Sequence, residues 1–376
     1  MVRAKAFSQP VYVTSPLLPG LEDMNKMLSL IWQSGQLTNN GRMAAQLEKE
    51  LTGFLGSESL SLFSNGTVAL QLACRLLRLS GEVITTPFTF AATCHALSWC
   101  NLTPVFCDIE ENTFNIDPKE IEKLITSNTT AIMPVHVFGN PCGVEEINGI
   151  AKKYGLKVIY DAAHAFGVEV GGKPIGCFGD ISMFSLHATK LYHTIEGGAL
   201  TFNDPYLKQR ADSLRNFGIL NEELIIEPGT NAKLNEVQAA VGILLLKQVN
   251  KEIEGRKAIT GIYRSLLKDV PGVKLFEEAE GVKYNYPYFV IAVNECEFGI
   301  SRDMLYERLK GYNVFARKYF YPLCSQFPCY KSLPSAVPGR LPVAEKIVGR
   351  VMALPLHGRL PGEYAERICA IIKEMH

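Results

Sequence analysis

The segment ISMFSLHATKLYHTIEGGAL, residues 181–200, runs from an apolar strand into a polar turn and on to a Glu-Gly-Gly triplet. The turn contains one lysine, Lys190. Because the strand before it is largely apolar, we expect it to lie in a sheet that is covered on both faces. Lys190 then lies at the mouth of a buried sheet rather than on a solvated face, which makes its amine a candidate reactive group.

Strand and helix patterns alternate on both sides of this segment. Strands are predicted at 82–87, 103–109, 130–139, 156–163 and 180–187, and the helices between them at 92–100, 118–125 and 143–155. Continuous apolar strands separated by helices predict a mostly parallel sheet with helices on both faces, which is an α/β fold.

The flanking regions complete the predicted organisation. The expected elements are helices at 21–35, 42–56 and 205–217, a long loop at 218–234, one long helix at 235–267, and then a strand at 286–293, a helix at 301–312, a strand and loop at 313–323 and a helix at 362–375. We therefore predict a large α/β domain over residues 1–245, with an N-terminal helical segment, and a small C-terminal α+β domain over residues 246–376.

A candidate phosphate site lies before the first of the alternating strands and helices. A short apolar strand ends at Ser64-Asn65-Gly66-Thr67, and a helix begins there. Free backbone N–H groups at the positive end of a helix suit a phosphate, with Gly66 and Thr67 closest to it. Ordinary capping of the helix by Asn65 or Thr67 explains the same residues, so both interpretations stay open.

Further candidates follow other strands of the predicted sheet. Asp161 follows the apolar strand KVIY, where a buried carboxylate needs a partner, although it is also a common helix cap. Phe90 follows EVITTP and offers a flat surface, although a phenylalanine there is more often core. The carboxyl ends of parallel strands meet at one edge. An amine, a carboxylate, a phosphate cradle and a flat ring are the four groups that pyridoxal phosphate requires.

Composition excludes several other classes of protein. The 38 basic and 38 acidic side chains balance, so no electrostatic footprint for nucleic acid or an anionic membrane is present. No apolar run reaches the roughly 18 residues of a spanning helix, and no signal peptide is recognised. The ten cysteines form no CxxC pair and no zinc spacing, so we expect reduced thiols, no metal and a cytoplasmic enzyme.

Six motifs in order make the interpretation specific: S-N-G-T, P-F-T-F-A-A-T, D-A-A-H, S-L-H-A-T-K, E-G-G-A and N-x-x-x-N-E-x-Q-A-A. Together they resemble the DegT/DnrJ/EryC1/StrS family of nucleotide-sugar aminotransferases. The resemblance extends over residues 16–361, and it implies the aspartate aminotransferase-like fold, fold type I of the pyridoxal phosphate enzymes.

The resemblance also implies roles for individual residues. Lys190 would attach the cofactor and later move protons, Asp161 would face the ring nitrogen, and His164 would bond the ring hydroxyl. Phe90 would stack on the ring. The phosphate would bind Gly66, Thr67 and Ser185, and Asn231 from the neighbouring subunit of a homodimer. Two departures from the family pattern, Asn231-Ala232-Lys233 and Gly41-Arg42, bear on the substrate more than on the chemistry.

Six residues are candidate contacts of the substrate. His136 and His187 lie near the expected site, but a structural, hydrogen-bonded histidine is as good an interpretation of each. Four residues of the C-terminal block 313–336 are further candidates: Arg317 and Lys318 for a diphosphate, although a solvated basic pair is the default, and Tyr319 and Tyr321 for a sugar or base.

By resemblance, the reaction moves an amino group from L-glutamate to a keto-deoxysugar nucleotide used in O-antigen or other polysaccharide biosynthesis. Block 313–336 and the motif around Lys190 resemble the branch that aminates carbon 4 of a dTDP-linked 4-keto-6-deoxy sugar; amination at carbon 3 is the alternative. The rivals are a sugar dehydratase, which has histidine in place of Lys190, a non-catalytic sensor, and an amino-acid aminotransferase, which needs an arginine clamp.

Overall fold

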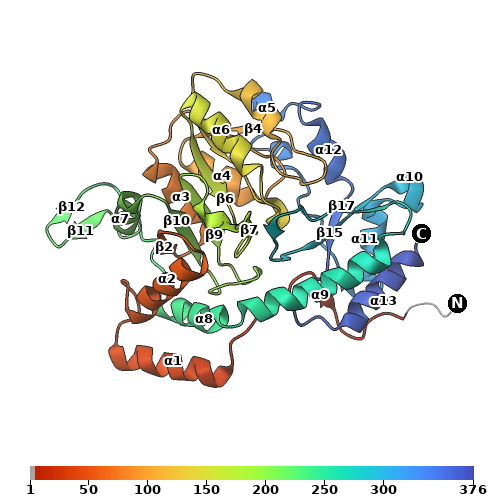
Figure 1. Ribbon diagram of the computed structural model, residues 1–376, viewed down its shortest axis with the longest axis horizontal. Helices are drawn as coiled ribbons and strands as arrows, with labels where there is room; N and C mark the ends of the chain where they lie inside the picture. Colours follow the sequence, from red (N-terminus) through yellow and green to blue (C-terminus); the bar gives the residue numbers. More distant parts are fainter. Residues whose placement is uncertain (1–4) are drawn as a thin grey trace.

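The computed structural model describes residues 5–376 and is built on a central seven-stranded sheet (Figure 1). Its strand order is β2 (Ser59–Phe63), β10 (Gly198–Phe202), β9 (Ile181–Ser185), β6 (Lys157–Asp161), β5 (Thr129–Met133), β3 (Glu82–Thr85) and β4 (Thr103–Phe106). Only β10 runs antiparallel to its neighbours, so the predicted mostly parallel sheet is confirmed.

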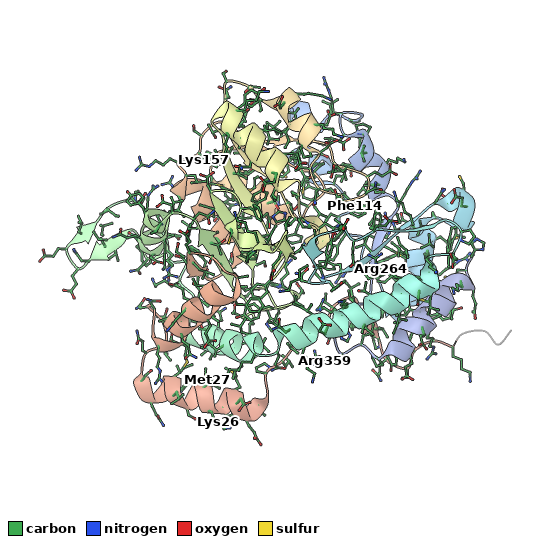
Figure 2. All side chains as sticks on the ribbon, viewed as in Figure 1. Lys26, Met27, Phe114, Lys157, Arg264 and Arg359 are labelled. Carbon is green, nitrogen blue, oxygen red and sulfur yellow. The ribbon has the colours of Figure 1, made fainter. Side chains whose placement is uncertain are left out.

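Helices cover both faces of this sheet. Successive side chains of a strand point to opposite faces, so each strand contributes side chains to both layers. Leu200 and Phe202 of β10 pack in one cluster with α3 (Gly66–Leu76), α4 (Ala91–Trp99) and α7 (Pro205–Leu214). Ala199, which precedes Leu200, packs in another cluster with α2 (Arg42–Phe54), α6 (Val144–Tyr154) and α8 (Glu236–Leu246). Figure 2 shows side chains filling the space between these layers.

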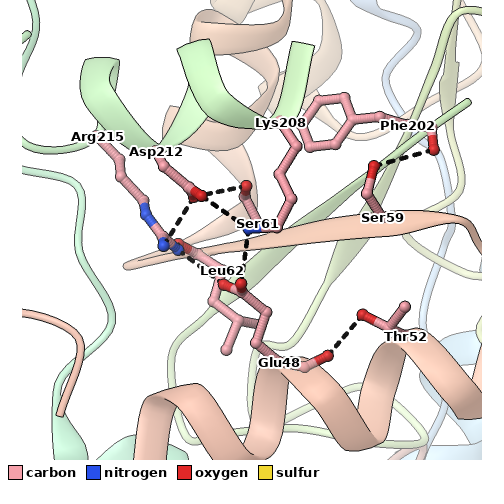
Figure 3. Close-up of polar contacts among 9 residues, drawn as sticks. All are labelled: Glu48, Thr52, Ser59, Ser61, Leu62, Phe202, Lys208, Asp212 and Arg215. Atoms are coloured by element: carbon pink, nitrogen blue, oxygen red, sulfur yellow. Dashed lines mark hydrogen bonds and ion pairs between the residues drawn. The ribbon is translucent and has the colours of Figure 1, made fainter. Parts of the chain in front are cut away.

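A charged network ties α7 to the edge strand β2 and to α2 (Figure 3). Lys208 lies 2.7 Å from both Glu48 and Asp212, and Arg215 lies 2.7 Å from Asp212 and 3.2 Å from Glu48. Ser61 of β2 donates to Asp212 at 2.8 Å. Because several charges share partners, this network holds the helix against the sheet edge better than an isolated surface pair does.

A smaller antiparallel sheet follows, with the order β13 (Val273–Leu275), β15 (Phe289–Val293) and β17 (Val351–Leu354). It packs with α9 (Val249–Leu267), α11 (Arg302–Lys310) and α13 (Gly362–Lys373). The N-terminal strand β1 (Val11–Tyr12) pairs in parallel with β16 (Val314–Phe315). The division at residue 245 stays a prediction, and a unit built around the smaller sheet would also include β1.

The remaining elements are short or lie on the surface. They are α1 (Leu21–Ser34), α5 (Pro118–Ile121), α10 (Glu295–Phe298), α12 (Pro342–Val348), the strands β7 (Glu169–Val170), β8 (Lys173–Pro174) and β14 (Val282–Lys283), and five 3₁₀ turns at 122–124, 137–139, 175–177, 324–326 and 334–336. In the described part of the chain, no helix combines the length and apolar character that crossing a membrane requires.

Two expectations about the connection to the smaller sheet are wrong. The predicted loop at 218–234 contains a short hairpin of β11 (Ile219–Asn221) and β12 (Leu224–Ile225), which extends away from the body (Figure 1, left). The predicted long helix at 235–267 is two helices, α8 and α9, which are separated at Lys247 and Gln248. We call residues 217–231 the arm.

A buried ion pair anchors α9 to two loops. Glu252 and Arg256, both at most 5% exposed, lie 2.7 Å apart, and Glu252 also accepts from the Gly358 backbone N–H at 2.8 Å. Arg256 donates to the Pro287 carbonyl oxygen at 3.0 Å. The pair therefore fixes the segment that leads into Tyr288, a residue of the cavity described next.

Candidate active site

A cavity of about 280 Å³ lies at the carboxyl ends of the parallel strands. Its walls come from the loop after β3, the end of β6, the segment between β9 and β10, the first turn of α3 and three residues near the smaller sheet, Tyr288, Tyr319 and Phe320. Nine of the residues predicted from the sequence line it: Gly66, Thr67, Phe90, Asp161, His164, Ser185, His187, Lys190 and Tyr319. Over residues 5–376, no cluster of acidic, histidine and cysteine side chains that could hold a metal ion is found.

Lys190 is positioned by the loop between β9 and β10. Its backbone N–H donates to the His187 carbonyl oxygen at 2.9 Å, and Ala188 donates to the Ile195 carbonyl oxygen at 2.7 Å. Burial lowers the pKa of Lys190 to about 8, and the Asp161 carboxylate, which favours the charged amine, opposes this shift. A large fraction of the amine is therefore neutral near pH 8, which suits a nucleophile or a proton acceptor.

Asp161 ends β6 with a side chain that is only 4% exposed. Thr93 donates to its Oδ2 at 2.7 Å, and the Ala163 backbone N–H donates to its Oδ1 at 3.1 Å. Burial raises the pKa of Asp161, whereas these hydrogen bonds and the Lys190 charge lower it. Asp161 and Lys190 thus lie in one cavity and affect each other's charge.

The start of α3, where the sequence predicts an anion site, lies at the cavity. Asn65 caps the helix by accepting from the Val68 N–H at 2.9 Å, which leaves the N–H groups of Gly66 and Thr67 at the cavity. A Cβ on Gly198 would meet the Asn65 carbonyl oxygen at 2.6 Å and Gly66 Cα at 2.9 Å. The Glu-Gly-Gly triplet therefore supplies the close backbone approach that brings β10 against this turn. Capping and anion binding use different groups here, so they are compatible.

Aromatic side chains form one wall of the cavity. The His164 ring stacks on Phe320 at 5.7 Å between centroids and meets the edge of Tyr288 at 5.2 Å. Its Nδ1 is buried and has no hydrogen-bond partner within residues 5–376. Burial holds the pKa of His164 well below its ordinary value, with the Lys190 charge lowering it further. Phe90, by contrast, is 61% exposed at the cavity.

Five predicted site residues lie elsewhere. His136 follows β5 as expected, but its ring is fully buried, stacks on Tyr160 at 4.8 Å and accepts from the Cys142 N–H at 3.0 Å. Burial lowers the pKa of His136 to about 3, so its ring is neutral, which favours the structural interpretation of this histidine. The other four are Asn231, Arg317, Lys318 and Tyr321, none of which is among the residues that line the cavity.

Physical reasons account for these four placements. Lys318 forms an ion pair with Asp303 at 2.7 Å, and the backbone of Arg317 pairs with that of Ala353. Tyr321 is 54% exposed. Asn231 is exposed at the base of the arm, where it forms a bridge with Asn216.

The structure adds residues that the sequence did not single out. Thr93 contacts Asp161 from α4, and Tyr288 and Phe320 complete the aromatic wall. Phe320 adjoins the predicted Tyr319, whereas Tyr288 has no local signal. Glu196, to which the sequence already pointed as the start of the Glu-Gly-Gly triplet, also lines the cavity, with its Oε1 3.6 Å from His187 Nε2.

Comparisons with known proteins show the family of the chain. Residues 20–373 match the model of the DegT/DnrJ/EryC1/StrS aminotransferase family. The chain is 46% identical over 367 residues to the dTDP-4-amino-4,6-dideoxy-D-glucose transaminase of Shigella dysenteriae. The aligned region covers 98% of this chain and 99% of that protein. It is 45% identical to the transaminase of the same name from Escherichia coli, over 96% of this chain and 97% of that protein.

A solved structure agrees in fold as well as in sequence. The crystal structure of DesI in the presence of its TDP-sugar product superposes with a TM-score of 0.94 at 35% identity, over 98% of this chain and 94% of that one. The family match over residues 20–373, the 46% identical relative and the superposed structure together show that the chain belongs to the DegT/DnrJ/EryC1/StrS aminotransferase family.

Proposed function

We propose that the chain transfers an amino group from L-glutamate to carbon 4 of a dTDP-linked 4-keto-6-deoxy sugar, giving a 4-amino-4,6-dideoxy sugar. One observation carries the chemistry: a lysine with a lowered pKa, a buried carboxylate and a helix N-terminus line the same cavity. The names of the Shigella and Escherichia relatives support this sugar. Amination at carbon 3 is the second candidate.

Pyridoxal phosphate is the proposed cofactor, and the cavity fits it. The partnerless Nδ1 of His164 suits the ring hydroxyl, and the first turn of α3 suits a phosphate. The residues that would hold it are Lys190, Asp161, His164, Phe90, Gly66, Thr67 and Ser185. When bound, this cofactor supplies an electron-accepting ring conjugated to the carbon that gains or loses nitrogen.

The chain's own residues then have distinct tasks. Lys190, neutral for much of the time near pH 8, accepts and returns a proton through its Nζ. Asp161 would supply the negative charge that stabilises a positive ring nitrogen. The α3 N–H groups would hold the phosphate, and Tyr288 and Phe320 would exclude water from one side. His187 and Tyr319 lie at the cavity and are the proposed sugar contacts.

Two further proposals concern the neighbourhood of the site. Arg317, whose charge opposes the burial-driven rise in the pKa of Tyr319, is the proposed contact of the diphosphate. Asn231 would complete the phosphate site of a second copy in a homodimer, which its exposed position on the arm permits. All ten cysteines are free thiols, which supports a cytoplasmic location.

The test of the substrate is a product analysis. With L-glutamate and dTDP-4-keto-6-deoxyglucose, we expect mass spectrometry to detect the amino sugar nucleotide and an equimolar amount of 2-oxoglutarate. The 3-keto isomer and the GDP-linked sugar serve as matched controls. Faster turnover of either control would reject the proposed substrate. Loss of water without incorporation of nitrogen would instead indicate a dehydratase.

The lowered pKa of Lys190 predicts how the rate of acylation of its amine depends on pH. In cofactor-free protein, the rate of acylation of Lys190 should rise about tenfold per pH unit below pH 8 and then level off, because the amine is largely neutral above its pKa. Lys153 is the control, since its hydrogen bond to Glu122 raises the pKa and its labelling should still increase at pH 10. Peptide mass spectrometry gives both rates, and parallel profiles would contradict the burial of the Lys190 amine.

A further inference from the structure

The carboxylate of Asp161 accepts a hydrogen bond from a residue of helix α4, Thr93. Thr93 lies in the first turn of α4 and is fully buried. Its hydroxyl donates to Asp161 Oδ2 at 2.7 Å. Thr93 is absent from the residues that line the cavity, whereas Asp161 is one of them. Thr93 therefore acts on the cavity through the two lining residues that its hydroxyl contacts, Asp161 and Thr89.

A second threonine sets the direction of this contact. Thr89, 3% exposed, has its hydroxyl oxygen 2.9 Å from that of Thr93. A hydroxyl has a single hydrogen to donate. When Thr93 gives its hydrogen to the ionised Asp161, Thr89 must donate to Thr93. The result is a directed chain of two hydroxyls that ends on the carboxylate.

The turn that carries Thr89 is fixed in place. The Cys324 backbone N–H donates to the Pro87 carbonyl oxygen at 2.9 Å, and its thiol donates to the Thr89 carbonyl oxygen at 3.4 Å. Neither threonine depends on solvent for its position. The chain is thus preorganised, and reorienting it is not required when the cavity fills.

Charged and titratable groups surround the carboxylate from every packed element. They are Lys190 from the loop after β9, His164 beyond β6, Cys94 of α4 and Cys142 before α6. Burial favours the protonated acid, and the Thr93 hydrogen bond is the strongest influence that opposes it. The Ala163 N–H and the Lys190 charge act in the same direction as Thr93.

We propose that Thr93, oriented by Thr89, is a positioning residue that keeps Asp161 ionised and aims its carboxylate into the cavity. The claim about Asp161 concerns the protein alone. Its consequence, tighter binding of a ligand with a positive ring nitrogen, rests on the proposed function. Thr93 is then a determinant of cofactor affinity that makes no cofactor contact.

The test compares Thr93→Val, which keeps the shape and removes the hydroxyl, with Thr93→Ser, which keeps the hydroxyl. The control is Thr260→Val, because Thr260 is buried in α9 and its hydroxyl has no partner within residues 5–376. Infrared spectroscopy of the cofactor-free full chain follows the carboxylic acid band that Asp161→Asn removes. In Thr93→Val the midpoint of the Asp161 titration should shift upward by about one pH unit or more. In Thr93→Ser and Thr260→Val this midpoint should not move.

Binding of pyridoxal phosphate is the second measurement. Thr93→Val should bind it about tenfold more weakly, in line with the shift in the titration midpoint of Asp161. Thr93→Ser should bind it as the wild type does. If Thr93→Val does not fold, Thr89→Val removes the orienting donor and should shift the midpoint in the same direction by less.

Two results would overturn the proposal: an Asp161 titration that is the same in Thr93→Val and wild type, or equal shifts in the valine and serine variants. An unshifted cofactor affinity in Thr93→Val would overturn its consequence for the ligand. If no variant binds pyridoxal phosphate, the proposed function fails, and the infrared titration still decides the role of Thr93.

Discussion

Lys190→Ala is expected to lower the rate of amino transfer by at least about 10³-fold. Loss of a positioned acid–base group alone costs about 10²–10⁴-fold, and this variant also loses the attachment point proposed for the cofactor. The measurement is the release of 2-oxoglutarate from L-glutamate. A small primary amine added to the variant should restore part of the rate, because it replaces the missing Nζ.

Two control variants distinguish the loss of the Lys190 amine from a general effect of replacing a lysine. Lys190→Arg keeps the positive charge but cannot supply a neutral amine, so it should be as inactive as the alanine variant. Lys157→Ala, in β6 (Figure 2), removes only a half-exposed pair with Asp180 and should retain wild-type activity. Near-normal turnover of Lys190→Ala without added amine would reject the assignment of Lys190.

Arg256→Met is expected to lower the free energy of unfolding by about 3–5 kcal/mol. The substitution leaves Glu252 buried with an uncompensated charge, and the Pro287 carbonyl oxygen loses its donor. Denaturant unfolding measures the loss where the transition is reversible. Because residues 286–288 are released, the affinity for substrate should fall as well.

The matched comparison is Lys153→Met, which removes an exposed pair with Glu122 and should leave the free energy of unfolding nearly unchanged. The double variant Glu252→Leu with Arg256→Leu should recover part of the loss, because no unpaired charge remains. Equal stability of Arg256→Met and Lys153→Met would show that the buried pair contributes nothing beyond a surface pair.

The sheet and the residues at its edge were predictable because both follow from local pattern. Apolar strands alternating with helices define a parallel sheet, and parallel strands bring their carboxyl ends together. That rule is sufficient to place Lys190, Asp161 and Gly66 in one cavity, as the structure confirms. It does not fix where each side chain points, and His136, at the end of β5, turns into the core to stack on Tyr160.

The other misses have no local signal. Lys247 and Gln248 are ordinary helix formers, so the break between α8 and α9 is set by packing. The hairpin in the arm is too short for a periodic pattern. Thr93 looks like any helix residue, and its partner Asp161 lies 68 positions away. Tyr288 reaches the cavity through the fold of the smaller sheet.

The pairing of β1 with β16 has a consequence for the newly made chain. Val314 is synthesised about 300 residues after its partner Val11, which at ribosomal rates of 5–20 residues per second takes roughly 15–60 s. Throughout this interval the partner strand of β1 does not yet exist. β1 must therefore stay unpaired while the seven-stranded sheet is made, and joining β1 to β16 belongs to a late stage of maturation.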